Sequence, residues 1–344
     1  MNYKKIFKKL LIIDGSYQLH RNLSVEQLFS LSDDEGHCTG GIFGTIRLIN
    51  SEIRKTDAFP VVVFDNGLSR RRLEVDPTYK HADERNIDND EVLTPDEARE
   101  DYITQYRFSR SMLTEMLPLF GIPVIKMVPW EGDDLMYIIS KLTEQSTILT
   151  DDRDLLQLLA PNVDVRRPKA KPVPGIDTDG QYYTLKRFLD ETGYRHMYEF
   201  VMQKAICGDK SDNIGKSCAG VAEGTAPALI KILENTILQN KDFPNNEKDL
   251  KELCENLEIK CKKAFLNFDR QKYENNLQLV DLSLVDDDID EHLVDSIVSI
   301  ISNCKEKTDV FAAHGYLGRF GINEIFPDEI IQEVNRRYHN LFLD

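Results

Sequence analysis

The sequence predicts an α/β fold with a mainly parallel central sheet flanked by helices, followed by a helical C-terminal domain. Short apolar runs alternate with segments of helical periodicity through the first half of the chain. These runs have the character of buried strands, as expected in a sheet that is covered on both faces. From about residue 181 onward the apolar pattern is helical. These three observations favour an α/β core and a separate helical part.

Five apolar runs are predicted to be strands. Helical periodicity occupies three of the segments between them, over 40–55, 103–120 and 132–144. Because helical crossovers join parallel strands, we expect the strands to share one sheet. Residues 66–102 are a polar stretch without clear strand signals. The strands are expected over 9–14, 59–65, 122–128, 146–150 and 163–167.

Length and composition predict a protein of about two domains. The 344 residues carry 43 Lys+Arg and 59 Asp+Glu, a net charge of −16. An acidic balance argues against nucleic acid as a partner unless the carboxylates gather in one metal site and the basic residues lie elsewhere. The six cysteines form no C-x-x-C pair, and no apolar run has membrane-spanning length. We therefore expect a soluble, monomeric protein of the cytoplasm with reduced thiols.

Carboxylates follow three of the predicted strands. Asp14 and Asp65 each end an apolar run, and the pair Asp151 and Asp152 ends another. Sites in parallel sheets form beyond the carboxyl ends of the strands, so these side chains are expected to converge if the strands are neighbours. Two further acidic groups, "EGDD" at 131–134 and "GDKSDN" at 208–213, lie at a helix start and after a helix.

Oxygen-rich clusters without His or Cys suit Mg²⁺ or Mn²⁺ and not structural zinc. Two such ions in one site support phosphodiester cleavage. The plainer alternative makes each acid a helix cap or a turn residue, and it is the better explanation for any one of them. Five groups, three of them at strand ends, favour a metal site. Spacing alone leaves metal phosphatases and phosphotransferases open.

Five motifs together resemble those of the 5′ nuclease or flap endonuclease family, in particular its bacteriophage ribonuclease H-type members. They are "LIIDGS", "VVVFDNG", "EGDDL", "ILTDDRDLLQL" and "GDKSDNI", in the family's order over about residues 10–230. The resemblance implies a PIN-like nuclease core over 1–180 with a helical arch inserted at 66–110. It also implies a helical domain over 181–344 with a degenerate helix–three-turn–helix near 206–232.

The same resemblance implies a Mg²⁺-dependent, structure-selective 5′→3′ exonuclease and flap endonuclease with two metal ions, in which Mn²⁺ can replace Mg²⁺. Cleavage would leave a 5′-phosphate and a 3′-hydroxyl, and the role would be removal of RNA primers and flaps in lagging-strand DNA replication. The acids would act in two groups. The first metal would be held around Asp14, Asp65, Asp133 and Asp152, with Glu131 and Asp134 assisting, and the second near Asp154, Asp209 and Asp212.

The polar insertion matches the family's arch motif R-x-x-x-x-P-x-Y-K at Arg72, Pro77, Tyr79 and Lys80. The resemblance implies that Lys80 touches the scissile phosphate and stabilises the transition state electrostatically. The family has another arginine three positions after that lysine, where this chain has Asp83, and Arg85 is the replacement that we expect. A solvated basic face is the alternative for these cations.

The family's G-I-G-P-K-T-A hairpin, which binds duplex phosphates and potassium, is altered in this chain. The matching run "GVAEGTAPALI" retains Gly220 and Thr225, whereas alanine and glycine replace a glycine and the lysine. Backbone N–H groups of such a turn still suit a phosphate. We expect Lys210 and Lys216 to add positive charge there, and potassium binding is left open.

The expected partners are forked or flapped DNA and RNA–DNA hybrids, with a sliding clamp and a single-strand DNA-binding protein as further candidates. The apolar tail at 338–344 either docks on a clamp or packs on the core. Two functional alternatives are a haloacid-dehalogenase-type phosphatase and an inactive DNA-binding scaffold. Ser16 stands where the phosphatase needs a second aspartate, and the scaffold would be expected to lack metal acids that this chain retains.

Overall fold

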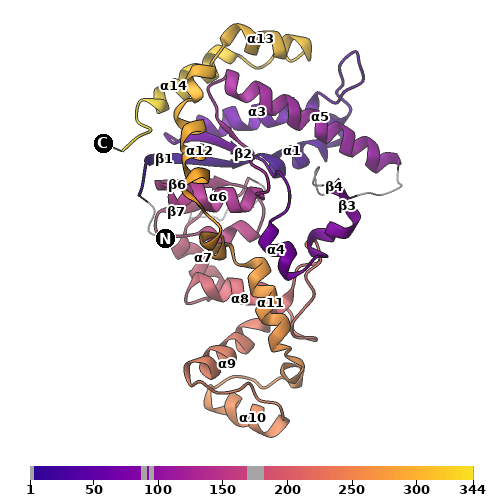
Figure 1. Cartoon of the computed structure of the whole chain (residues 1–344), viewed down its shortest axis with the longest axis vertical. Helices are drawn as coiled ribbons and strands as arrows, with labels where there is room; N and C mark the ends of the chain where they lie inside the picture. The colour runs from indigo at the N-terminus through magenta and orange to yellow at the C-terminus, as the bar shows by residue number, and fades with distance from the viewer. Residues whose placement is uncertain (1–3, 87–90, 93–96, 169–181, 344) are drawn as a thin grey trace. The chain divides into compact units, whose positions relative to one another are not determined.

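The computed structural model describes residues 4–86, 91–92, 97–168 and 182–343, and contacts divide the chain into two compact units (Figure 1). Unit 1 comprises residues 1–67, 86–185 and 285–344. Unit 2 comprises residues 68–85 and 186–284. In the described part of the chain, no helix combines the length and the apolar character that a membrane crossing needs.

Unit 1 is built on a six-stranded sheet with the order β5-β2-β1-β6-β7-β8. The neighbouring pairs from β5 to β7 are parallel, and β8 runs antiparallel to β7. Leu10 to Ile13 of the central strand are at most 1% exposed, because both faces of the sheet are covered. This confirms the predicted α/β core. The strands are β1 (Phe7–Asp14), β2 (Phe59–Val63), β5 (Val124–Ile125), β6 (Thr143–Leu149), β7 (Val163–Arg166) and β8 (Tyr182–Tyr183), while β3 (Arg85–Asn86) and β4 (Glu91–Val92) form a separate two-stranded sheet.

The register of the sheet brings three strand ends to one edge. Asp14 at the end of β1 lies opposite Val63, the last residue of β2. On the other side of β1, Ile13 lies opposite Leu149, the last residue of β6. Because the strands are parallel, the residues that follow β1, β2 and β6 leave the sheet at the same edge. This edge is where the acidic motifs of unit 1 begin.

Helices cover the sheet of unit 1. α1, α3 and α5 pack against one another, and α6 packs against β1 and β6. Leu135, Ile138 and Ile139 of α6 are fully buried, as the i, i+3, i+4 spacing of an amphipathic helix requires. The helices of this unit are α1 (Gly15–Leu23), α2 (Glu26–Phe29), α3 (Gly40–Ile53), α5 (Glu97–Leu119), α6 (Gly132–Lys141), the 3-10 helices η2 (Asp154–Leu158) and η5 (Cys304–Lys307), α12 (Glu291–Ser302), α13 (Val310–Arg319) and α14 (Pro327–Tyr338).

The last 60 residues pack on the α/β core of unit 1. Arg337 of α14 is 4% exposed, and its Nη2 donates to the carbonyl of Ile53 at 2.6 Å. The tail after α14 adds an antiparallel bridge to β1, with Lys8 N–H donating to Leu341 O at 2.8 Å. The ring of Phe342 lies 5.9 Å from that of Phe7. Of the two alternatives for the tail, the structure therefore shows the packed one.

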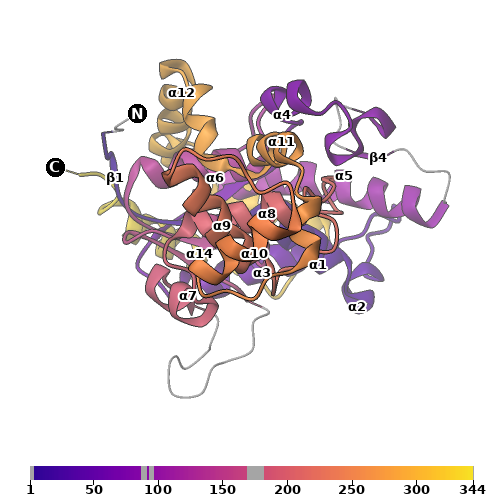
Figure 2. The same ribbon diagram turned by 90° about the horizontal axis from the view of Figure 1, so that it is seen from below.

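Unit 2 has its own apolar core, formed mainly by three helices. α8 packs against both α9 and α11, which lie beside it in both views (Figure 1, Figure 2). The core also contains Tyr79, at 3% exposed, from the segment 68–85. The elements of this unit are α4 (Arg70–Val75), η1 (Tyr79–Glu84), α8 (Met197–Cys207), α9 (Ala226–Leu238), α10 (Glu247–Asn256), η3 (Lys263–Asn267) and α11 (Arg270–Val280), while α7 (Leu185–Thr192) and η4 (Leu282–Asp287) extend across its boundaries.

The two units, which are defined by contacts within the chain, have boundaries that differ from the single division expected at residue 180. The main segment of unit 2 begins close to the expected boundary, at residue 186. However, residues 285–344 group with the α/β core, and residues 68–85 from the expected arch group with the helical unit. The physical reason is apolar burial, because Leu73, Val75 and Tyr79 pack on the core of unit 2. The expected arch at 66–110 is described only outside 87–90 and 93–96.

Candidate functional site

Asp14 is the buried centre of the acidic edge of unit 1. Its side chain is 7% exposed and caps α1, where Oδ1 accepts the N–H of Tyr17 at 2.9 Å. Its Oδ2 accepts the hydroxyl of Thr150 at 2.8 Å. Both of these donors are neutral, so they orient the carboxylate without balancing its charge.

Asp65 lies two residues beyond the end of β2 and faces the start of α6. Its Oδ1 accepts the N–H of Gly132 at 2.6 Å. A Cβ at position 132 would lie 3.0 Å from that oxygen, so glycine allows the helix to approach the carboxylate closely. The N–H of Asp65 donates to the hydroxyl of Ser16 at 3.0 Å. Ser16 therefore supports the backbone of Asp65 at the position where a phosphatase would need an aspartate.

The turn after β6 arranges the acids of the motif "TDDRD". The N–H of Asp152 donates to Thr150 Oγ1 at 3.0 Å, and Asp152 Oδ1 accepts the N–H of Asp154 at 2.8 Å. Asp151 is 7% exposed, and one of its carboxylate oxygens lies 4.0 Å from Nε of Arg167. Asp151 thus has a cation of its own chain nearby, which agrees with its place outside the expected metal ligands.

The charges of these acids act on one another. Burial is the largest cause that raises the pKa of Asp14, and the charge of Asp65 is the next. Asp152 adds a smaller repulsion, and together these effects outweigh the hydrogen bonds from Tyr17 and Thr150 and raise the pKa of Asp14 to about 7. The three strand ends therefore bring Asp65 and Asp152 close enough to Asp14 to disfavour its ionisation.

The remaining acids of unit 1 lie at the first turn of α6 and at η2. Glu131 precedes the first residue of α6 and is 2% exposed, and Asp134 in its first turn is 1% exposed. Asp133 is half-buried in the same turn, and Asp154 begins η2. Negative charge is favoured at the N-terminus of a helix, where backbone N–H groups point outward. Local helix electrostatics thus stabilises the α6 acids.

Asp209 and Asp212 belong to unit 2, in the loop that follows α8. The N–H and hydroxyl of Ser211 both donate to Asp209 Oδ1, and Nζ of Lys204 lies 3.1 Å from Oδ2. Although burial alone would raise the pKa of Asp209, the contacts with Ser211 and Lys204 lower it below its usual value. Gly208 closes the loop at φ +68, where a Cβ would lie 2.4 Å from the carbonyl of Ile214.

Two residues of the expected arch motif are buried inside unit 2. Arg72 is 2% exposed, and its Nε donates to the carbonyl of Leu279 at 2.9 Å. Tyr79 is 3% exposed within the apolar core. In this structure both are packing residues, and the expectation that they contact DNA stays a prediction. Lys80 is half-buried, and its N–H donates to Asp212 O at 2.9 Å, while the side chain of Arg85 lies outside the described residues.

The connection between α8 and α9 holds the other expected DNA contacts. Gly220 has φ +85, and the hydroxyl of Thr225 donates to Ala222 O at 3.0 Å before α9 begins. Lys216 Nζ donates to Val221 O at 2.8 Å and so braces the turn. Lys210 is exposed. The altered hairpin is thus a well-bonded turn with one basic side chain engaged within it.

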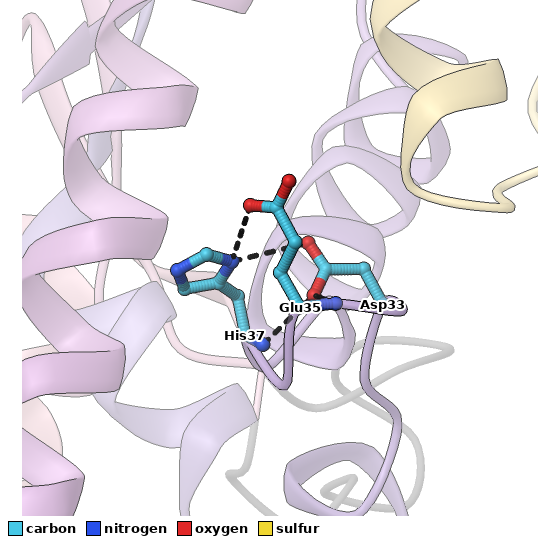
Figure 3. A group of neighbouring side chains, drawn as sticks. All are labelled: Asp33, Glu35 and His37. Carbon is cyan, nitrogen blue, oxygen red and sulfur yellow. Dashed lines mark hydrogen bonds and ion pairs between the residues drawn. The ribbon is translucent and has the colours of Figure 1, made fainter.

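Two groups of described residues bring three ligand atoms within 4.8 Å of one another, and neither contains the acids at the strand ends. The first is Asp33, Glu35 and His37 in unit 1, where both carboxylates face Nδ1 of His37 at 3.2 and 3.6 Å (Figure 3). Asp33 also accepts two backbone N–H groups of its own turn. The second contains His196, Glu199 and Glu234 in unit 2, and Arg195 donates to both glutamates. Each group is explained by its internal contacts.

Sequence reasoning missed the residues that hold the acids in place. Thr150 contacts both Asp14 and Asp152, and Ser16 holds the backbone of Asp65. Thr150 stands between an apolar run and an acidic pair in the sequence, and this position could have predicted that its hydroxyl contacts the acids. Ser16 lies two residues after Asp14, but its partner at position 65 depends on which strands are neighbours. Strand order cannot be deduced from local pattern.

The donor chemistry of the strand-end acids fits a divalent cation. The group offers carboxylate oxygens only, as Mg²⁺ and Mn²⁺ prefer. Its central member is buried and repelled by its neighbours, so a cation placed among them would be stabilised by the same charges.

Comparisons with known proteins point to one family. The family model described as "5'-3' exonuclease, N-terminal resolvase-like domain" matches residues 9–193. A 5′-3′ exonuclease of Aquifex aeolicus is 28% identical over 284 residues, which cover 79% of this chain and 87% of the relative. DNA polymerase I of Bacillus caldotenax is 30% identical over 229 residues, which are 65% of this chain and 23% of the polymerase. The chain thus spans less than a quarter of that longer relative.

Solved structures show the same fold. A crystal structure of the bacteriophage T5 flap endonuclease, a pseudo-enzyme–product complex with DNA and metal ions, aligns with a TM-score of 0.55. The alignment covers 96% of this chain and all of that one at 18% identity. Human GEN1 in complex with Holliday junction DNA aligns with a TM-score of 0.52 and covers 97% of this chain and 75% of that one at 14% identity. At these identities the likeness establishes the architecture alone.

Proposed function

Because the chain belongs to the family of 5′-3′ exonucleases, we propose that it is a divalent-metal-dependent 5′ nuclease that acts on forked or flapped DNA and on RNA–DNA hybrids. The expected reaction is phosphodiester hydrolysis that leaves a 5′-phosphate and a 3′-hydroxyl. Removal of RNA primers during lagging-strand replication is the role that we infer for it. Mg²⁺ is the metal that we propose, with Mn²⁺ able to replace it.

One observation carries the proposal. Asp14, Asp65 and Asp152 lie far apart in the sequence but meet at the carboxyl edge of a parallel sheet, where burial and then the charges of Asp65 and Asp152 raise the pKa of Asp14 to about 7. A fold selected for stability alone would separate such charges or pair each with a cation. A group of carboxylates at this edge is therefore best explained by a function in which the group binds cations.

The proposed ligands divide by unit. In unit 1, Asp14, Asp65, Asp133 and Asp152 would hold the first ion, with Glu131 and Asp134 assisting. We propose that Asp154, Asp209 and Asp212 contribute to binding of a second ion. Bound divalent cations would lower the pKa of water and neutralise charge that develops on phosphate oxygens.

Other groups of the chain would orient the metal-binding carboxylates and bind the phosphates of the substrate. Thr150 and the N–H of Tyr17 fix the two oxygens of Asp14, and Gly132 and Ser16 fix Asp65. Lys80 is the cation that we propose for the scissile phosphate, as an electrostatic contact that strengthens as negative charge develops. Lys210 and the turn at Gly220 are proposed to contact duplex phosphates, which fixes register without reading sequence.

Cleavage of a labelled forked DNA and a labelled RNA–DNA hybrid, each with Mg²⁺ and with EDTA, tests the proposal. We expect 5′-end cleavage of both substrates with Mg²⁺ and none with EDTA. The Asp152→Asn variant should lose cleavage while still binding the fork, because the substitution removes a metal ligand and leaves the basic surfaces unchanged. Full activity of this variant would refute the proposed site.

The neighbouring Asp151→Asn variant is a matched control. It makes the same chemical change one residue away, at a carboxylate that lies near Arg167. We expect it to retain divalent-ion affinity, measured by calorimetry, and cleavage. Equal losses in the two variants would show that the turn is sensitive to any change and that Asp152 has no special role.

A further inference from the structure

Two segments of unit 2 that are distant in sequence are locked together by hydrogen bonds. Nδ2 of Asn213 donates to the carbonyl of Thr78 at 2.9 Å and lies 3.1 Å from its hydroxyl. In the reverse direction, the N–H of Lys80 donates to the carbonyl of Asp212 at 2.9 Å. The loop after α8 therefore holds the backbone on both sides of Tyr79.

The backbone at this junction is strained. Lys80, His81 and Asn213 have φ values of 51, 56 and 58, in the left-handed region that residues other than glycine rarely adopt. Consecutive left-handed residues such as Lys80 and His81 persist only when surrounding contacts hold them. The bonds from Asn213 and to Asp212 are contacts of this kind. A cationic residue whose left-handed backbone is held by such contacts is a candidate for a function that depends on its position.

The side chain of Lys80 lies beside the ring of Tyr79, the residue whose flanking backbone is held by the loop after α8. Its Nζ lies 5.5 Å from the centre of the Tyr79 ring, and the guanidinium of Arg72 lies 5.8 Å from that ring. Tyr79 and Arg72 are buried, so neither can follow a displacement of Lys80. Asn213, in contrast, is exposed, so its side chain is the accessible partner in the hydrogen bonds to Thr78.

We propose that Asn213 is a positioning residue for Lys80. Its amide fixes the carbonyl of Thr78, which holds the left-handed turn that directs Lys80. The proposal rests on the proposed function, in which Lys80 meets the substrate phosphate. On this basis, the loop that carries Asp209 and Asp212 also sets the position of the phosphate-binding cation.

The test is a double-mutant cycle measured by steady-state cleavage of forked DNA. Asn213→Gly removes the amide but tolerates the left-handed backbone, so it isolates the hydrogen bonds. We expect kcat to fall about 10- to 100-fold with little change in KM, since a small displacement of a catalytic group has an effect of this order. In a Lys80→Ala background the same substitution should change kcat less than twofold, because Lys80 is no longer present to be positioned.

Asn240→Gly is the matched control. Asn240 is exposed in the same unit and has φ 50, so the substitution makes the same backbone and side-chain change away from Thr78. It should leave kcat and KM as in the unsubstituted chain. Melting temperatures of all variants identify any loss of folding, and a kcat loss in Asn213→Gly that merely parallels a fall in melting temperature would overturn the proposal.

The remaining outcomes separate the two proposals. If Asn213→Gly lowers kcat by the same factor with and without Lys80, Asn213 does not act through Lys80 and the positioning proposal is wrong. If Lys80→Ala cleaves normally, the positioning proposal is also wrong, while the nuclease proposal is judged by Asp152→Asn. If no protein cleaves the fork with Mg²⁺, the proposed function itself fails and the positioning proposal fails with it.

Discussion

The acidic groups of the two units differ in what balances their charge. At the sheet edge of unit 1, Asp14 is held by neutral donors, and burial together with the charge of Asp65 raises its pKa to about 7. In unit 2, Asp209 lies beside the ammonium of Lys204 and accepts two bonds from Ser211, so its pKa falls. One carboxylate is destabilised when it ionises, and the other is stabilised.

This difference indicates which acids depend on a cation from outside the chain. A divalent ion at the sheet edge would relieve repulsion that the fold leaves in place. At Asp209 an ion would have to compete with Lys204, which already compensates the charge. We therefore expect the acids of unit 1 to dominate metal affinity and those of unit 2 to contribute less.

The largest expected effect is that of Asp14→Asn. Loss of the central carboxylate should lower the cleavage rate on the order of 10³-fold or more, because it removes a proposed ligand of the first metal ion. Asp209→Asn should have a smaller effect. Single-turnover cleavage at a series of Mg²⁺ concentrations measures both, and equal losses would abolish the distinction between the units.

The second prediction concerns stability against pH in EDTA. The pKa of Asp14 is raised from 3.8 to about 7 in the folded chain, so between these values the folded state binds more protons than the unfolded state. Its contribution to stability is greatest below pH 4 and is lost as the pH rises through about 7, by up to about 4 kcal/mol. The lowered pKa of Asp209 has the opposite sign, because its contribution is present above its ordinary pKa and is lost as the pH falls.

Urea unfolding from pH 4 to pH 8 checks this second prediction. Relative to the unsubstituted chain, Asp14→Asn should gain stability as the pH rises over this range. The contribution of Asp209 changes only below its ordinary pKa, so the stability difference between Asp209→Asn and the unsubstituted chain should stay constant from pH 4 to pH 8. Adding Mg²⁺ at pH 8 should reduce the difference between the Asp14 variant and the unsubstituted chain, because the ion replaces protons in relieving the repulsion. If all three proteins have parallel pH profiles of stability, the expected difference between Asp14 and Asp209 is wrong.

The third prediction tests the support of Asp14. Thr150→Val keeps the shape of a fully buried side chain but removes the hydroxyl that donates to Asp14 and accepts from Asp152. We expect divalent-ion affinity to fall about 10- to 100-fold, as is typical when a partner of a ligand is lost. Calorimetric titration with Mn²⁺ measures it, and an unchanged affinity would mean that the turn after β6 orients its acids without Thr150.

Local pattern predicted five of the six strands in the sheet of unit 1, because buried parallel strands are continuous apolar runs, and it predicted the helices α3, α5 and α6. It did not predict the short antiparallel strand β8. It also placed Asp14, Asp65 and Asp152 at strand ends, since a carboxylate that stops such a run is visible without knowledge of the partners. Local pattern did not reveal that Arg72 and Tyr79 are buried. A basic, aromatic motif has the same appearance whether it faces solvent or packs on a core, and that choice depends on contacts with Leu279 and its neighbours. Charge compensation at Asp209 was hidden for a related reason, because only the folded loop shows that Lys204, one helical turn before it, points at the carboxylate.

The smallest expected effect is that of Lys204→Gln, which asks whether the compensation in unit 2 is real. Both partners are partly buried, so removal of the ammonium should lower the free energy of unfolding by about 1 kcal/mol and raise the pKa of Asp209. Lys186→Gln is a suitable control, because Lys186 forms an exposed ion pair with Asp190 and should change stability little. Urea unfolding and NMR titration of Asp209 measure the two quantities. If Lys204→Gln also increases Mn²⁺ affinity, Lys204 competes with the metal at Asp209, whereas an unchanged pKa of Asp209 would show that Ser211 alone sets its charge state.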